Sequence, residues 1–173
     1  KAVNRANTCG TKHDEGGIVE WSRRLTESWD DQSYGVSADG LGNVYMSGSL
    51  GGPFILNAFV SKYDAAGTLQ WSRQSRHFED NVSYGVSADG LGNVYISGYT
   101  AGSLGGPTAG GYDAFVSTYA AAGTPQRTPQ VDTGPPDLGA WRAGDRQGAR
   151  DIRADTDGRP TRHHRRRQPA ALR

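Results

Sequence analysis

The side chains that most often carry out chemistry are few in this chain of 173 residues, and they are widely separated. The four histidines are His13, His77, His163 and His164. None of them stands in an HExxH or comparable metal-ligand spacing, and the chain has no GxSxG motif for a nucleophilic serine. The two LGGP segments lack the Lys-Ser/Thr ending of a phosphate-binding loop. The sequence therefore predicts no catalytic residues, no cofactor and no metal ligands, and we expect a protein that is not an enzyme.

Two smaller arrangements could still carry chemistry. Glu79 and Asp80 follow His77 closely and would suit acid and base catalysis, but neighbours on one loop are a weak basis for convergent geometry. Asp39 and Asp89 stand in Gly- and Asn-rich turns that resemble part of a calcium loop. Calcium needs about six to eight oxygen ligands, whereas each DGLGN turn supplies one carboxylate. We therefore expect these two aspartates to cap their own hairpins.

The segments that position these residues occur twice. The stretch SYGVSADGLGNVY is found at Ser33–Tyr45 and again at Ser83–Tyr95, an offset of 50 residues. The tripeptide Trp21–Arg23 returns as Trp71–Arg73 at the same offset. Repetition at such a period is typical of architectures in which one unit stacks on copies of itself, because a single copy cannot bury its own apolar surface.

Each copy has the local signals of short strands. Four runs contain Val, Tyr, Phe, Trp or Thr and are bounded by Gly, Asp or Asn: Tyr34–Ala38, Val44–Ser47, Ala58–Tyr63 and Thr68–Arg73. The turns ADGLGN (Ala38–Asn43) and DAAG (Asp64–Gly67) supply residues that close tight hairpins. Four strands in about 50 residues match the size of one propeller blade. Trp21 and Trp71 then fall on outer strands, where a large ring fills the gap between diverging blades.

Several motifs in this order and spacing resemble the SBBP-type β-propeller repeat of bacterial secreted and cell-surface proteins: YGVSAD, GNVYISG, DAFVS-x-Y and GTLQW. The resemblance covers about Lys12 to Thr124. It implies an all-β fold of β-propeller blades, each a four-stranded antiparallel meander, and a location at the cell surface or outside the cell. It implies no activity or catalytic residue set that could be transferred. One departure is Asn57, which replaces the expected Asp, so the shortened loop before Ala58 is expected to be remodelled.

The repeat boundaries predict four parts of the chain. Residues 1–25 end a preceding blade, residues 26–74 form blade 1, residues 75–128 form blade 2 with a degraded last strand, and residues 129–173 are a degenerate third repeat or a disordered, out-of-frame basic tail. A closed propeller has about four to eight blades. We therefore expect a partial, open propeller, which is either a segment of a longer repeat protein or a unit that self-associates.

A four-stranded meander places its connections on two rims. We call the rim with the ADGLGN and DAAG turns the repeated rim, and the opposite one the variable rim, because TESWDDQ (residues 26–32) becomes RHFEDNV (residues 76–82) there. We expect partner contacts on the variable rim. The candidate residues are Trp29, Asp30, Asp31, His77, Phe78, Glu79 and Tyr112. The alternative is that these residues form ordinary solvated loops, with Trp29 and Phe78 packed between blades.

The composition changes after residue 123. Residues 1–123 hold 8 Lys and Arg against 12 Asp and Glu, whereas residues 124–173 hold 11 Arg against 6 Asp. Such a segment, with few apolar residues, cannot bury enough surface to offset the entropy of ordering it, so we expect a disordered tail. Its RHHRRR cluster (Arg162–Arg167) offers a rival function, the binding of nucleic acid or an anionic surface. Interspersed Asp residues and the lack of aromatic residues around the cluster argue against nucleic acid.

The sequence favours a noncatalytic β-propeller scaffold that binds a protein or carbohydrate partner within an exported or cell-surface protein. A rival from another class is the propeller portion of a polysaccharide-acting enzyme with its site on the variable rim, because a fold alone does not fix function. Cys9 is the single cysteine, which excludes an internal disulfide. The chain has no apolar run of membrane-spanning length and no visible signal peptide.

Overall fold

The computed structural model of this chain describes residues 8–25, 30–52, 54–75, 78–108 and 111–131. Within these residues all the regular elements are β-strands. They are β1 (Thr8–His13), β2 (Val19–Leu25), β3 (Asp31–Ala38), β4 (Val44–Gly51), β5 (Leu56–Tyr63), β6 (Leu69–Gln74), β7 (Asn81–Ala88), β8 (Val94–Thr100), β9 (Asp113–Tyr119), β10 (Pro125–Arg127) and β11 (Gln130–Val131). The predicted strands are confirmed, and β3 and β4 extend further toward the variable rim than predicted.

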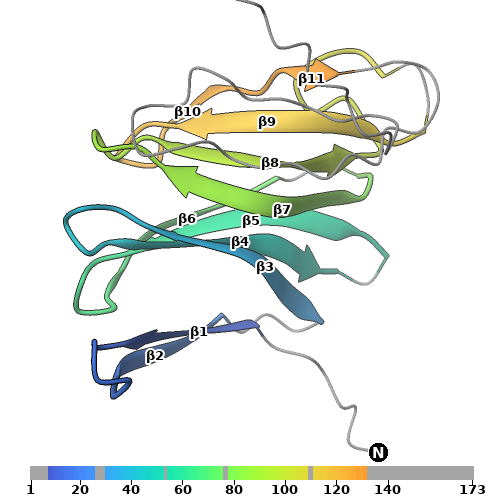
Figure 1. The fold of residues 1–173 in the computed structure, drawn as a ribbon. Coiled ribbons are helices and arrows are strands. Elements are labelled where there is room, and N and C mark those ends of the chain that lie inside the picture. The colour runs from blue at the N-terminus through green and yellow to red at the C-terminus, as the bar shows by residue number, and fades with distance from the viewer. Residues whose placement is uncertain (1–7, 26–29, 53, 76–77, 109–110, 132–173) are drawn as a thin grey trace, which may run out of the picture.

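The strands form three antiparallel sheets that lie one above another (Figure 1). The strands β1 and β2 form the N-terminal hairpin, and β3 to β6 pair in chain order as a four-stranded meander, blade 1. The strands β7 to β10 form the second meander, blade 2, in which β11 also pairs with β9. No sheet in the described chain closes on itself. The fold is therefore an all-β, open array of propeller-type blades.

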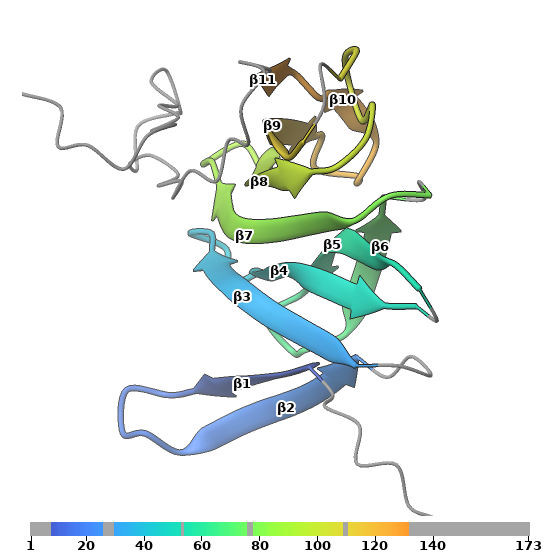
Figure 2. The same cartoon turned by 90° about the vertical axis from the view of Figure 1, so that its right-hand side faces the viewer.

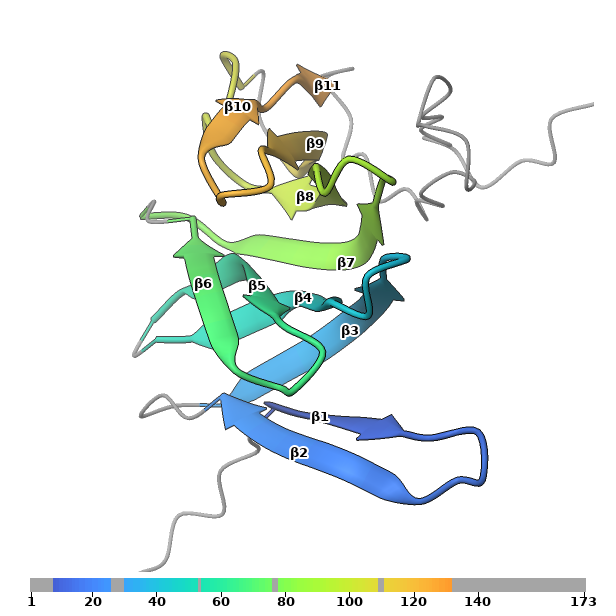
Figure 3. The same ribbon diagram turned by 90° about the vertical axis from the view of Figure 1, so that its left-hand side faces the viewer.

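The first strands of the two blades lie together on one side of the array. Figures 2 and 3 show β3 at one edge of blade 1 and β6 at the opposite edge, with β7 running above β3. The strands β3 and β7 are in contact. The blades thus approach one another at their first strands, as in a propeller in which the first strand of each blade is the inner one.

Apolar clusters fill both spaces between the sheets. The cluster between the N-terminal hairpin and blade 1 contains Trp21, Val44, Met46, Leu50, Phe59 and Tyr63. The cluster between the blades contains Tyr45, Ala58, Val60 and Trp71 from blade 1 and Val86, Val94, Ile96 and Phe115 from blade 2. Adjacent residues such as Tyr45 and Met46 face opposite neighbours because side chains alternate along a strand. The central strands of blade 1, β4 and β5, are therefore buried on both faces.

The last strand of blade 2 differs from that of blade 1. The strand β10 has three exposed residues and pairs with β9 through an irregular register, with Pro125 and Arg127 where the first copy has Leu69 and Trp71. The strand β11 pairs its two residues with Phe115 and Ala114, so the sheet includes residues beyond position 128. Residues 132–173, with the RHHRRR cluster, lie outside the described residues.

Candidate functional site

The first hairpin of each blade, on the repeated rim, is capped by an aspartate, Asp39 in blade 1 and Asp89 in blade 2. Oδ1 of Asp39 accepts hydrogen bonds from the backbone N–H groups of Leu41 (2.9 Å) and Asn43 (3.0 Å). Its Oδ2 accepts from Asn43 Nδ2 (2.7 Å) and from the Tyr45 hydroxyl (2.9 Å). Asp89 makes the same four bonds within its own hairpin. The prediction that these aspartates are hairpin caps is confirmed, since each carboxylate is bonded within its own turn and the strand that follows.

The hydrogen bonds that Asp39 and Asp89 accept also determine the charge of these two side chains. Partial burial acts to raise the pKa of Asp39, but the bonds from Asn43, Tyr45 and Leu41 outweigh burial and hold the pKa below its usual 3.8. The pKa of Asp89 is lowered by the same balance. Both groups are therefore carboxylates at neutral pH.

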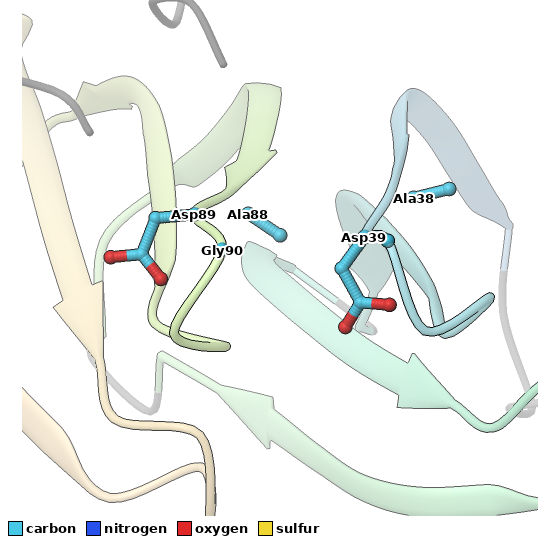
Figure 4. Close-up of a pocket in the computed structure, with 6 residues that line it drawn as sticks. Ala38, Asp39, Ala88, Asp89 and Gly90 are labelled. Carbon is cyan, nitrogen blue, oxygen red and sulfur yellow. The ribbon is translucent and has the colours of Figure 1, made fainter. Parts of the chain in front are cut away.

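A pocket of about 450 Å³ lies between the two caps, lined by Ala38, Asp39, Gly40, Ala88, Asp89 and Gly90. Figure 4 shows that the Asp89 carboxylate points away from Asp39, with the Ala88 side chain between the two hairpins. Each carboxylate is committed to its own turn. The pocket thus follows from the spacing of two identical hairpins and brings no reactive groups together.

A tryptophan and an arginine on each outer strand clasp the next blade. Trp21 Nε1 donates to the carbonyl of Ala65 (3.0 Å), and Arg23 Nε donates to the carbonyl of Gly67 (2.6 Å). The indole lies so close over Gly67 that a Cβ there would be 2.6 Å from the ring. The φ of Gly67 is +76°, a conformation that glycine adopts readily.

The second clasp repeats the first atom for atom. Trp71 Nε1 donates to the carbonyl of Ala121 (3.0 Å), and Arg73 Nε donates to the carbonyl of Gly123 (2.6 Å). Gly123 has φ +77° and the same close contact with the indole. Trp71 is 9% exposed. The prediction that the two tryptophans pack between blades is confirmed.

The variable rim holds the predicted partner-binding residues in several different environments. Phe78 is 96% exposed, so the alternative in which it packs between blades is wrong. Asp30 and Glu79 are also exposed. Asp31 is 2% exposed, and its Oδ1 accepts from the backbone N–H of Gly51 (3.2 Å), which makes it a buried cap and removes it from the contact surface. The candidates Trp29 and His77 lie outside the described residues.

Tyr112 belongs to a chain of aromatic rings that the sequence did not reveal. Ring centroids are 5.2 Å apart for Tyr34 and Tyr84, 5.8 Å for Tyr84 and Tyr99, and 4.9 Å for Tyr99 and Tyr112. We call these four residues the tyrosine ladder. It extends from β3 of blade 1 across β7 and β8 to the residue before β9. Tyr34, Tyr84 and Tyr112 are each between 37% and 46% exposed, so much of the ladder faces solvent.

A repeated bulge positions the first two rings. Ser33 pairs with Gly48 and Gly35 with Ser47, which leaves Tyr34 as the extra residue, and Tyr84 is the extra residue in blade 2. A β-bulge turns the side chain of the extra residue away from the regular alternation. The two tyrosines were present in the repeated motif, but a bulge depends on pairing with a strand that the motif alone does not specify.

The sequence segments that lead into β3 and β7 are acidic. Residues 26–32 and 76–82 together contain five carboxylates and one arginine. Burial, followed by the effects of Tyr84, Tyr112 and Asp80, raises the pKa of Tyr99 to about 12, so its hydroxyl is neutral and able to donate a hydrogen bond. Asp80 also links the blades, since its Oδ1 accepts from the backbone N–H of Leu56 (2.8 Å). Its carboxylate therefore has a structural partner in blade 1.

In the described part of the chain, no group of three or more His, Cys, Asp and Glu side chains is arranged to hold a metal ion. The same residues include no helix with the length and apolar character needed to cross a membrane.

Stacked four-stranded meanders, joined by repeated tryptophan clasps, define a β-blade repeat protein. Residues 20–54 match the SBBP family model, described as a beta-propeller repeat. The matched segment runs from β2 of the N-terminal hairpin across the connection into β3 and β4 of blade 1. The chain therefore contains an SBBP-type repeat at residues 20–54, and its described residues have the structure of a repeat scaffold. No curated protein sequence matches it.

Proposed function

We propose that this scaffold is noncatalytic and binds a basic protein partner through the tyrosine ladder. The observation that supports the proposal is the ladder itself, four rings in consecutive contact with half-exposed faces on one rim. Tyrosine is enriched at protein interfaces because the ring buries apolar area while the hydroxyl keeps a hydrogen-bond partner. A cluster of such rings is the usual centre of binding energy.

The surrounding charge favours a partner with lysine or arginine residues. The variable-rim segments have an excess of four carboxylates. Complementary charge speeds encounter and selects the partner, and an exposed tyrosine face attracts a guanidinium or ammonium group. Asp30 and Glu79 are exposed and precede Tyr34 and Tyr84 in the sequence by a few residues. Of the partner-binding residues predicted from the sequence, these two suit the attraction of a positively charged partner.

The experiment is a fluorescence anisotropy titration of the full chain with a labelled peptide rich in Arg, Lys and aromatic residues. Wild type should bind, with an affinity that falls at high salt. Tyr84→Ala, in the middle of the ladder, should weaken binding about tenfold or more. Leu91→Ala is the matched control, because Leu91 is 82% exposed on the repeated rim and lies outside the ladder. Equal loss in both variants, or no loss in Tyr84→Ala, contradicts the proposal.

The same titration includes neutral and acidic oligosaccharides. The proposal expects no tyrosine-dependent binding of either sugar, since neither offers positive charge to the acidic rim. Binding of a neutral oligosaccharide that Tyr84→Ala abolishes would replace the protein partner by a carbohydrate one. Hydrolysis of an oligosaccharide that depends on Glu79 would contradict the noncatalytic part of the proposal.

We further propose that the blades continue, either in a longer chain or by self-association, in an extracellular or cell-surface setting. Among the described residues β1 pairs only with β2, so the N-terminal hairpin has two strands where each blade has at least four, and the other edge of β1 has no strand beside it. Light scattering over a concentration series should show association of the isolated chain, and a stable monomer at all concentrations contradicts this. Protease treatment of intact host cells should remove the protein if it lies at the surface.

A further inference from the structure

A row of three polar side chains crosses blade 2 beside the variable rim, at the ends of β7, β8 and β9 on the right of Figure 1. Asn81 pairs with Thr100, and Thr100 pairs with Asp113. Paired residues on neighbouring antiparallel strands point to the same face of the sheet. Here it is the face that carries Ile96 and Phe115 toward blade 1. All three polar side chains are fully buried, each with 0% exposure.

Two oxygen atoms of this row have no hydrogen-bond partner among the described residues, Asn81 Oδ1 and Asp113 Oδ1. The other end of each side chain is held in place. Asn81 Nδ2 donates to the carbonyl of Glu79 (2.6 Å), and Asp113 Oδ2 accepts from Gln130 Nε2 (2.7 Å). Buried polar atoms in native proteins nearly always have a partner, so two fixed and unpaired oxygens in one row point to a bound species.

More oxygen atoms lie around the row. The Thr100 hydroxyl donates to the carbonyl of Gly102 (3.1 Å), which Gln130 Nε2 also contacts (3.0 Å). The Glu79 carboxylate lies against Gly102, where an added Cβ would be 2.3 Å from Oε2. Within the described part of the chain, no lysine or arginine forms a salt bridge with Glu79 or Asp113. A buried carboxylate is costly without a compensating positive charge.

We propose that this row is a calcium site, with Asn81 Oδ1 and Asp113 Oδ1 as ligands and with Glu79 and water completing the shell. The donors are hard oxygen atoms, which calcium prefers, and it accepts about six to eight of them in flexible geometry. The small number of carboxylates indicates the weak affinity of extracellular modules, a Kd on the order of 10⁻⁴–10⁻³ M. The bound ion would connect the first three strands of blade 2 at the variable rim.

Blade 1 does not have this site. The residues at the same register are Asp31, Leu50 and Asn57, so the middle oxygen is replaced by an apolar side chain. Leu50 packs in the cluster against the N-terminal hairpin, and Asp31 has the backbone N–H of Gly51 as a partner. The proposed site is therefore a property of blade 2 alone. Its test is separate from that of the tyrosine ladder, because calcium is the probe and no protein partner enters the experiment.

The test is calorimetry and thermal unfolding of the chelator-treated full chain with calcium chloride. Calcium at about tenfold above the expected Kd should raise the Tm by about 3–6 °C. Asp113→Asn should weaken calcium binding at least tenfold and remove the rise in Tm. The control Glu15→Gln removes one carboxylate in the exposed N-terminal turn and should leave calcium binding unchanged. Magnesium should bind more weakly than calcium, because it demands a regular octahedral shell.

A second variant keeps the test decisive if Asp113→Asn does not fold. Asn81→Asp introduces the residue that stands at this register in blade 1 and adds a carboxylate to the shell. It should tighten calcium binding severalfold. An absence of calcium binding in wild type overturns the proposal and leaves an ordered water as the partner of the two oxygens. Wild-type affinity in both Asp113→Asn and Asn81→Asp overturns it as well.

Discussion

The two rims of the blades differ in how their contacts recur. On the repeated rim, Asp39 and Asp89 accept the same four hydrogen bonds. On the variable rim, Asp31 is a buried cap, whereas its counterpart Asn81 leaves an oxygen unpaired in a polar row. Identity between the copies therefore marks the caps and clasps that hold the blades together. It does not exclude a binding role, because Tyr34 and Tyr84 belong to the repeated motif and also to the tyrosine ladder.

The largest expected effect is a loss of stability on removal of a tryptophan that joins neighbouring blades. Trp71→Ala removes the indole that packs against Gly123 and Tyr119 and donates to Ala121. Truncation of such a buried ring should lower the free energy of unfolding by about 3–5 kcal/mol. Urea or thermal unfolding measures the change. Trp21→Ala is the internal comparison and should cost less, because it joins only a two-stranded hairpin to blade 1. If Trp71→Ala lowered the free energy of unfolding by less than Trp21→Ala does, the role of the clasp between the blades would be contradicted.

A smaller effect tests the glycine under the indole. Gly123→Ala forces a residue with a Cβ into φ +77° and places that carbon 2.6 Å from the Trp71 ring. The left-handed conformation alone costs about 1–2 kcal/mol, and displacement of the ring adds to it. Gly40→Ala is the control, since nothing lies within 4 Å of a Cβ there. Equal melting temperatures for the two variants would show that the close packing of the clasp is not required.

The smallest effect concerns the pH dependence of the aspartate caps. Because the folded-state pKa values of Asp39 and Asp89 lie below 3.8, the caps stabilise the fold above that pH. Their contribution is lost as the pH falls from 3.8 through the lowered folded-state values. The double variant Asp39→Asn, Asp89→Asn should therefore show a weaker loss of Tm across this range than wild type. Circular dichroism melts from pH 6 to about 2 measure the difference, and parallel curves would contradict it.

Much of the fold could be predicted from the sequence because its determinants are local. The hairpin caps depend on residues within six positions of Asp39, and the strands on runs of β-forming side chains. The close packing of Trp71 on Gly123 was not visible, since it joins residues 52 positions apart, although the packing of Trp71 between blades was expected. Asp31 was expected at the surface because it lies in a segment that differs between the copies, but the sequence did not show that β3 begins at Asp31.

The candidate site could be predicted only in part. Tyr112, Asp30 and Glu79 were found because they fall in segments that differ between the copies. Tyr34 and Tyr84 were missed because they belong to the repeated motif, and only the bulge in the β3–β4 and β7–β8 pairs turns them toward each other. The row of Asn81, Thr100 and Asp113 arises from pairing among three strands, so no single segment of the sequence contains it.

The claim that the variable rim carries the binding surface is tested most directly by mapping the residues that a ligand contacts. Backbone amide shifts of the isotope-labelled full chain are followed by NMR during titration with the basic peptide. We expect shifts at Tyr34, Tyr84, Tyr99 and Tyr112 and none in the turns at residues 38–43 and 88–93. Shifts confined to those repeated turns would contradict the claim that the variable rim carries the binding surface.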